Sequence, residues 1–207
     1  MDKTIELAKG VSIELYLDWE KEENKIKISE MVYQRFYERY IKPYSFPNAN
    51  FKKEYKNGFA MMGSACLMIE SYMAFKKGEE DTKGIGRDCF CEFLNTESEF
   101  STFKDTSTNS SGQYLKSALP SKFYYNVRCG ILHQGETKEG WTITRENGTT
   151  LFDKSSLTVN AYLFLLNMDK VLKRYESELK KANWNDIIWE KLRDKFGFVI
   201  KNCQKNT

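Results

Sequence analysis

Apolar residues recur along most of this chain at the spacing of helices. From Ser29 onward, Met31, Phe36 and Tyr40 follow a period close to 3.6 residues, with Ser29 as the expected N-cap. The prolines at positions 43 and 47 are expected to end this helix. Further helices are expected over residues 58–77, 85–103, 120–135, 158–182 and 184–196. Residues 1–28 alternate apolar and charged patches, and their pattern does not separate strand from helix.

The segment 58–77 is apolar almost all the way round, which is typical of the central buried helix of a bundle. Two β-prone runs within residues 141–153 flank Asn147-Gly148, a pair that favours a type I′ turn, so a hairpin is expected there. The pattern therefore predicts an all-α fold: a helical bundle with one small β-hairpin. We expect a single helical domain over residues 1–207, in which 1–50 and 166–207 are additional helices or extensions of the core that lies between them.

Composition supports a folded helical protein and excludes a disordered one. The chain has 207 residues, of which 41% are hydrophobic and 14% aromatic, and it has only 12 glycines and 3 prolines. The net charge of +3 is too small to indicate a nucleic-acid-binding protein, although it does not oppose one.

The cysteines and the N-terminus point to the cytoplasm. No two of the 5 cysteines have CxxC spacing and the chain has a single histidine, so no metal site and no cofactor is expected. An odd number of unpaired cysteines suits a reducing compartment. The first residues lack the pattern of a signal peptide, and the apolar run 59–69 is too short to cross a bilayer, so we expect no membrane association.

The strongest candidates for chemistry are Arg128 and His133, in the string YNVRCGILHQGET. Histidine is the side-chain type that can accept and donate protons near neutral pH, and an arginine inside an apolar helix is costly unless it binds something. On an ideal helix the two residues point about 140° apart and cannot converge on one group. Convergence is then expected only if Gly130 and Gly135 loosen the helix end, or if two copies of the helix meet across a two-fold axis.

Glu70 is the one charged residue between Phe59 and Phe75. It is either a carboxylate at the rim of the bundle or a partly buried partner of Arg128 that orients the guanidinium. The sequence leaves both interpretations open.

An Arg, four residues and a His near the end of a helix resemble the signature of HEPN domains, which are small helical bundles. The longer string FYYNVRCGILHQGETKEGW, together with GFAMMGSACLMIE and DTKG before it, is similar to a bacterial HEPN subgroup. The resemblance covers roughly residues 58–165. One position differs: many HEPN nucleases have a polar residue, often Asn, where this chain has Cys129.

The resemblance implies a metal-independent endoribonuclease that acts as a homodimer on RNA, in a toxin–antitoxin or phage-defence system, with an antitoxin protein as a possible partner. Arg128 and His133 would be its catalytic pair and Glu70 a supporting residue. The RNA 2′-OH would attack the adjacent phosphate to leave a 2′,3′-cyclic phosphate. Two alternatives stay open: a non-catalytic HEPN-like module that binds a nucleotide, an RNA or a protein, and a structural helical protein in which Arg128 and His133 only cap and pair.

Overall fold

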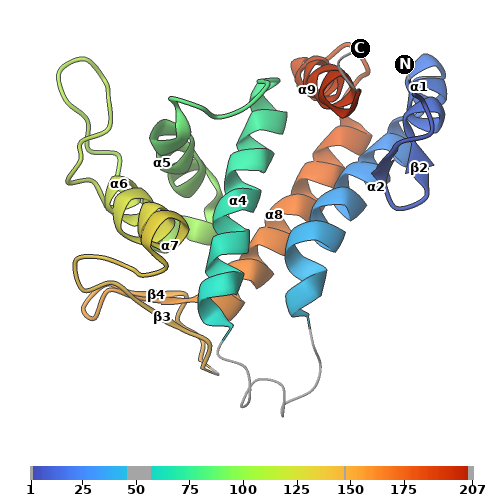
Figure 1. Cartoon of the computed structure of the whole chain (residues 1–207). Coiled ribbons are helices and arrows are strands. Elements are labelled where there is room, and N and C mark those ends of the chain that lie inside the picture. The colour runs from blue at the N-terminus through green and yellow to red at the C-terminus, as the bar shows by residue number, and fades with distance from the viewer. Residues whose placement is uncertain (1, 46–56, 147, 205–207) are drawn as a thin grey trace.

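The computed structural model describes residues 2–45, 57–146 and 148–204, and most of the regular structure in them is helical. The helices pack around α4, and two small sheets lie towards opposite ends of the molecule (Figure 1). The helices are α1 (Ile13–Lys21), α2 (Lys25–Phe36), the π-helical η1 (Tyr37–Ile41), the 3-10 helix η2 (Lys42–Tyr44), α4 (Gly58–Lys77), α5 (Gly86–Thr96), the 3-10 helix η3 (Ser98–Phe103), α6 (Leu119–Phe123), the π-helical η4 (Tyr124–Arg128), α7 (Cys129–Gln134), α8 (Ala161–Lys181) and α9 (Ile187–Cys203).

The N-terminal segment combines a short strand pair with helices. Strands β1 (Glu6–Ala8) and β2 (Val11–Ser12) pair antiparallel and lead directly into α1. The prediction that Ser29 caps the next helix is wrong. Asn24 is the N-cap of α2, where its side chain accepts a hydrogen bond from the Lys27 amide. Ser29 is buried inside the helix, and its hydroxyl donates to the Ile26 carbonyl instead.

Helix α4 has the bounds that the sequence predicts and lies at the centre of the bundle. By length and composition the helix is apolar enough to span a membrane, because it extends beyond the short apolar run 59–69. However, 67% of its apolar window is buried inside the protein. Such burial is typical of the core helix of a soluble protein. Gly78 ends the helix in the left-handed conformation that favours glycine.

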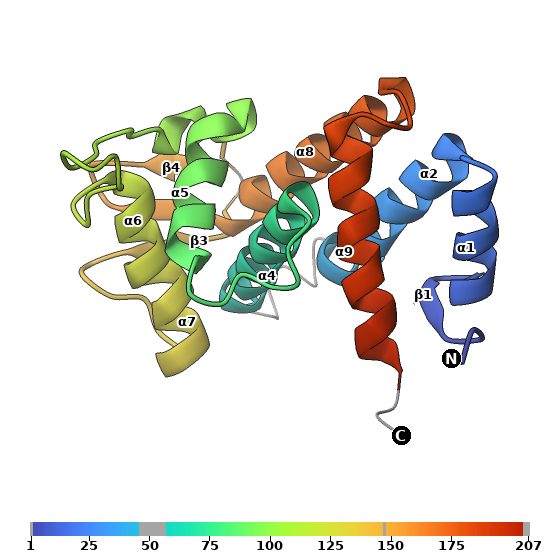
Figure 2. The ribbon, with the colours of Figure 1, turned by 90° about the horizontal axis from the view of Figure 1, so that it is seen from above.

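The terminal helices share the core of the central ones. Helix α4 packs against both α8 and α9, and α2 packs against α8. One continuous cluster of buried apolar side chains extends from Leu7 in β1 to Ile200 in α9. Seen from above, α5, α6 and α7 lie at one end of the molecule and α1 and α2 at the other (Figure 2).

The hairpin predicted for residues 141–153 does not form. Strands β3 (Thr142–Thr144) and β4 (Phe152–Asp153) are separated by β5 (Thr158–Asn160), which pairs parallel with β3 and antiparallel with β4. Asn147, half of the expected turn, lies outside the described residues. The strand β5 occupies the first residues of the helix predicted at 158–182. That helix starts only at Ala161, because the Asn160 side chain accepts hydrogen bonds from the amides of Tyr162 and Leu163.

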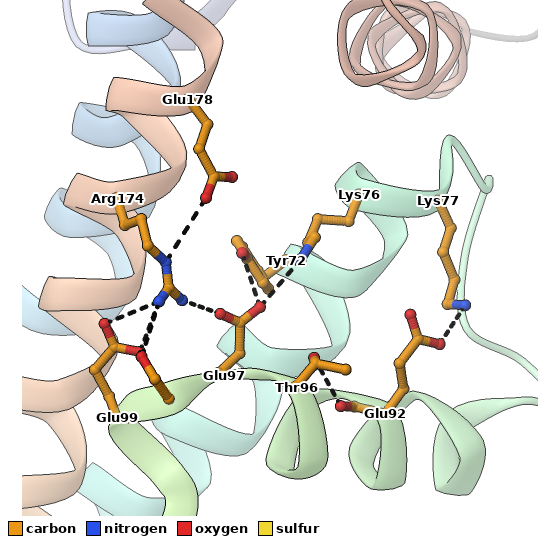
Figure 3. Close-up of polar contacts among 10 residues, drawn as sticks. Tyr72, Lys76, Lys77, Glu92, Thr96, Glu97, Glu99, Arg174 and Glu178 are labelled. Atoms are coloured by element: carbon orange, nitrogen blue, oxygen red, sulfur yellow. Dashed lines mark hydrogen bonds and ion pairs between the residues drawn. The ribbon is translucent and has the colours of Figure 1, made fainter.

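A cluster of charged side chains joins α4, α8 and the junction between α5 and η3 (Figure 3). Glu97 is only 4% exposed, and its carboxylate accepts hydrogen bonds from the Tyr72 hydroxyl at 3.2 Å, Lys76 Nζ at 3.1 Å and the Arg174 guanidinium. Arg174 also pairs with Glu99 at 3.1 Å. These contacts satisfy a buried carboxylate and hold α5 against the two long helices.

Candidate functional site

The candidate catalytic residues lie on a continuous helix formed by α6, η4 and α7, from Leu119 to Gln134. We call it the motif helix. Its first turn contains Pro120, as predicted, but its N-cap, Ala118, has no capping side chain. The carboxylate of Asp105, in the preceding loop, accepts the hydrogen bond of the Leu119 amide at 2.9 Å. Gly135 ends the helix with a φ of 72°.

The middle turn of this helix is π-helical, over Tyr124–Arg128. Such turns are rare and often occur at functional sites. Phe123 and Val127 are fully buried and Ile131 is partly buried, so these three residues form the stripe of the helix that faces the core. Arg128 lies next to this stripe, at the end of the π turn.

Glu70 on α4 is the partner of Arg128. Arg128 Nε donates to Glu70 Oε1 at 2.6 Å, and the side chains are only 17% and 16% exposed. The structure therefore contains the ion pair that was one of the two interpretations of Glu70. Partial burial alone would lower the pKa of Arg128, but the hydrogen bond and charge of Glu70 outweigh it and raise the pKa. The guanidinium keeps its two terminal nitrogens for other contacts.

One of these terminal nitrogens reaches His133. Arg128 Nη1 lies 3.5 Å from His133 Nε2, and the imidazole is exposed to solvent. The expectation that the two side chains cannot converge from one helix is wrong, because the long arginine side chain spans the angle between them. A guanidinium only donates hydrogen bonds, so this contact requires an unprotonated Nε2 as the acceptor.

The glycines next to the pair do not loosen the helix, contrary to one of the expected routes to convergence. Gly130 is helical and buried, and a Cβ built there would lie 2.4 Å from the Glu136 carbonyl oxygen. Gly130 thus allows the chain that follows the helix to fold back onto it. Gly135 is the left-handed residue that lets the chain make this turn.

Tyr124 forms a second support for Arg128. The guanidinium carbon lies 5.5 Å from the centre of the Tyr124 ring, within the range of a cation–π contact. The Tyr124 hydroxyl would be 3.1 Å from a Cβ at Gly86, so a residue without a side chain leaves room for it. Burial, followed by the neighbouring Cys129, raises the pKa of Tyr124.

A cavity of about 600 Å³ opens on the side of Arg128 that faces α5. His133 is not one of the residues that line it. Arg87 at the start of α5 was not singled out from the sequence, although the glycines of GIGR beside it are a signal of close backbone packing. Side chains that line the cavity include Glu70, Lys83, Arg87, Asp88, Tyr124, Tyr125 and Arg128.

The cysteines have packing roles in this region. All of them are free thiols. Burial raises the pKa of Cys66, beneath the ion pair, and raises that of Cys89 to about 11, so both stay protonated. Cys129, directly after Arg128, is half-buried. Within the described ranges 2–45, 57–146 and 148–204, no three His, Cys, Asp or Glu side chains gather closely enough to hold a metal ion.

Comparisons of the chain with profiles of known protein families, with curated proteins and with solved structures find no match. The geometry of the site therefore carries the functional argument.

Proposed function

We propose that this protein is a metal-independent endoribonuclease of the HEPN type. The observation that carries the proposal is the convergence of three side chains. Glu70 holds the Arg128 guanidinium in place, and this guanidinium lies within 3.5 Å of the exposed His133 imidazole. A fixed cation beside a proton acceptor at the surface is what phosphodiester cleavage through a neighbouring hydroxyl requires.

The reaction uses a nucleophile that RNA itself supplies. When the phosphate replaces His133 as the partner of Arg128 Nη1, the lone pair of His133 Nε2 is free to accept the proton of a 2′-OH. The 2′-oxygen forms a bond to the adjacent phosphorus, and the bond from phosphorus to the 5′-oxygen breaks. The leaving oxygen takes up a proton, which leaves a 5′-hydroxyl and a 2′,3′-cyclic phosphate. Arg128 stabilises the charge that builds up on the phosphoryl oxygens. DNA lacks the 2′-OH and is not cleaved.

A second copy of the chain would complete this chemistry. Proton removal and proton donation are separate roles, and the chain has one histidine. In a homodimer the partner's imidazole supplies the second role. Support comes from an apolar groove of about 460 Å³ beside the motif helix, where Leu67 on α4 and Leu132 on α7 are 46% and 38% exposed. Leu132 directly precedes His133, so a two-fold contact there brings two histidines near each other.

We infer a cytoplasmic toxin or phage-defence effector, controlled by an antitoxin protein. The free thiols support a reducing compartment. An exposed pair that needs no cofactor would cleave RNA whenever it is free, so a partner protein that covers His133 is a direct means of control.

The experiment that tests the function is RNA cleavage by the purified protein in the presence of EDTA. Native protein is expected to release fragments that end in 2′,3′-cyclic phosphate, and His133→Ala is expected to release none, because no other histidine replaces it. Cleavage that persists in His133→Ala, or that stops on chelation, contradicts the mechanism. Mixed dimers of native and His133→Ala chains test the two-copy arrangement, since they keep one imidazole per dimer.

One observation favours the alternative of a non-catalytic binding module. Cys129 stands at the position where HEPN nucleases often have an amide, and a thiol cannot replace the hydrogen bonds of an amide to phosphate. In that case native protein binds RNA but leaves it intact.

A further inference from the structure

The cavity next to Arg128 is larger than the proposed reaction needs. A volume of about 600 Å³ lies in the middle of the range found for small-molecule sites. Cleavage of a phosphodiester at the Arg128–His133 pair uses only one residue of its lining, Arg128. The other residues of the lining, at the start of α5 and on the π turn η4, can therefore bind another part of a ligand.

Arg87, at the start of α5, is a second arginine in the lining of this cavity. Its Nε and Nη2 atoms both donate to Asp88 Oδ1, at 3.0 and 2.9 Å, and the side chain is 24% exposed. The hydrogen bond to Asp88, with a smaller contribution from the Tyr125 hydroxyl, raises the pKa of Arg87. The guanidinium is thus held in one orientation while part of it faces the cavity. Arg87 and Arg128 thus place two guanidinium groups in the lining of the same cavity.

The π turn contributes two aromatic side chains to the lining of the same cavity. Tyr124 and Tyr125 both line the cavity, with ring centres 5.4 Å apart in an edge-to-face arrangement. Tyr124 is occupied by the Arg128 guanidinium, but Tyr125 is 38% exposed. An exposed aromatic face on the wall of a cavity is a stacking surface for a nucleic-acid base.

We propose that this cavity is a subsite for one unpaired nucleotide of the RNA, adjacent to the phosphate that Arg128 binds. The base stacks on Tyr125 and the next phosphate along the strand lies against Arg87. This inference rests on the proposed function in so far as RNA is the substrate. It adds the requirement that the nucleotide next to the cleavage point is unpaired, because a base within a duplex cannot enter the cavity.

The polarity of the walls fits a nucleotide better than a bare anion. The carboxylates of Glu70 and Asp88 line the same cavity as Lys83 and Arg87. A carboxylate accepts hydrogen bonds and repels a phosphate, whereas the edges of bases carry N–H donors that a carboxylate can bind. A mixed lining with an aromatic face therefore matches base and phosphate together. A free mononucleotide has the same chemistry as a nucleotide within RNA, and the test separates the two.

The test measures binding in the His133→Ala background, where RNA stays intact. Anisotropy of a labelled single-stranded oligoribonucleotide of mixed sequence is followed at fixed salt. Arg87→Ala and Tyr125→Ala are each expected to weaken binding about tenfold, the loss typical of one stacked base or one ionic contact. Tyr125→Phe retains the ring and loses only the contact of its hydroxyl with Arg87, so it is expected to bind clearly better than Tyr125→Ala. Lys21→Ala on α1, at the other end of the molecule, removes one charge as Arg87→Ala does and leaves binding unchanged (Figure 2).

Two further arms identify the ligand. The same RNA in a duplex is expected to bind more weakly than the single strand, and the difference disappears in Tyr125→Ala. A mixture of the four nucleoside monophosphates competes poorly, because most of the affinity comes from the strand outside the cavity. Strong competition by a monophosphate would instead show a site for a free nucleotide and overturn the assignment to RNA.

The outcomes separate this inference from the proposed function. If native protein cleaves RNA through His133 but Arg87→Ala and Tyr125→Ala bind like the parent, the subsite is wrong and the ribonuclease stands. If native protein never cleaves RNA but both variants lose affinity, the subsite stands and the catalytic proposal fails. Absence of any RNA binding overturns the subsite as well.

Discussion

The carboxylate of Glu70 accepts a hydrogen bond of 2.6 Å from Arg128 Nε, although 58 residues separate the two in the chain. Both side chains are mostly buried, so each compensates the charge of the other where few waters can do so. Because the pair uses only Nε of the guanidinium, the terminal nitrogens remain directed to other groups, and Nη1 meets His133. This contact between α4 and the motif helix brings Glu70 into one site with Arg128 and His133.

Glu70→Gln is expected to slow RNA cleavage about tenfold or more, since a hydrogen bond to a charged group contributes about 1.5–3 kcal/mol and the neutral amide no longer fixes the guanidinium. The far-UV circular dichroism should not change. Single-turnover experiments measure the cleavage rate, and urea unfolding measures the stability of the variant. A double-mutant cycle with Arg128→Leu should give a coupling free energy, and simple additivity of the two variants would show that the pair does not act as a unit.

Arg128→Lys is expected to lower the cleavage rate nearly as much as Arg128→Ala, by about 10²–10³-fold. Lysine keeps the charge but lacks the planar fork that contacts Glu70 and His133 at the same time. Rates with saturating RNA measure this loss at the chemical step. Near-native activity of Arg128→Lys would mean that charge alone suffices and that the geometry of the fork has no role.

Gly130→Ala is expected to destabilise the protein by about 1–3 kcal/mol and to reduce cleavage, because its Cβ would meet the Glu136 carbonyl at 2.4 Å and displace the end of the helix that carries His133. Gly135→Ala is the matched control. Its φ is 72° but nothing lies within 4 Å of its Cβ, so only backbone strain of about 1 kcal/mol is expected. Thermal unfolding of both variants measures the difference. Equal effects would contradict the close approach at Gly130.

Acid is expected to destabilise the start of the motif helix through Asp105. Hydrogen bonds from Ser107 and from the Leu119 amide hold the pKa of this carboxyl below its ordinary value of 3.8. A lowered pKa in the folded state contributes stability that is present above the ordinary value and is lost as the pH falls through the lower one. Asp105→Asn should therefore lower Tm at pH 7 and show a smaller further loss below pH 4 than the native protein. The exposed Asp18→Asn on α1 should leave both unchanged.

Glu97→Gln is expected to destabilise the protein by about 3 kcal/mol, because it leaves Lys76 and Arg174 without their shared buried carboxylate (Figure 3). Glu178→Gln removes a partner of the same arginine at 3.8 Å that is 49% exposed, and should cost less than about 1 kcal/mol. Urea unfolding compares the two. Similar losses would show that burial does not distinguish the two carboxylates.

Local pattern determined much of this fold. The apolar run of α4 and the amphipathic repeats of α8 and α9 are visible in the sequence, since a helix is set by side chains that are three and four residues apart. Arg128 and Glu70 stood out in the sequence as charged residues in apolar segments, and His133 as the single histidine of the chain. Helix ends were less certain, as the true cap of α2 is Asn24 and not Ser29.

Only the tertiary structure decided the relationships between distant residues. Strand β5 lies between the two runs that were expected to form a hairpin, because β pairing depends on which backbone edge a distant segment reaches and not on the turn alone. The reach of the Arg128 side chain brought its guanidinium to His133, against the expectation for two side chains on one ideal helix. The cavity arises where the start of α5 meets that turn, a juxtaposition made by packing around α4. The sequence shows which side chains can carry the chemistry, whereas their meeting in one site depends on contacts between distant residues that no local pattern contains.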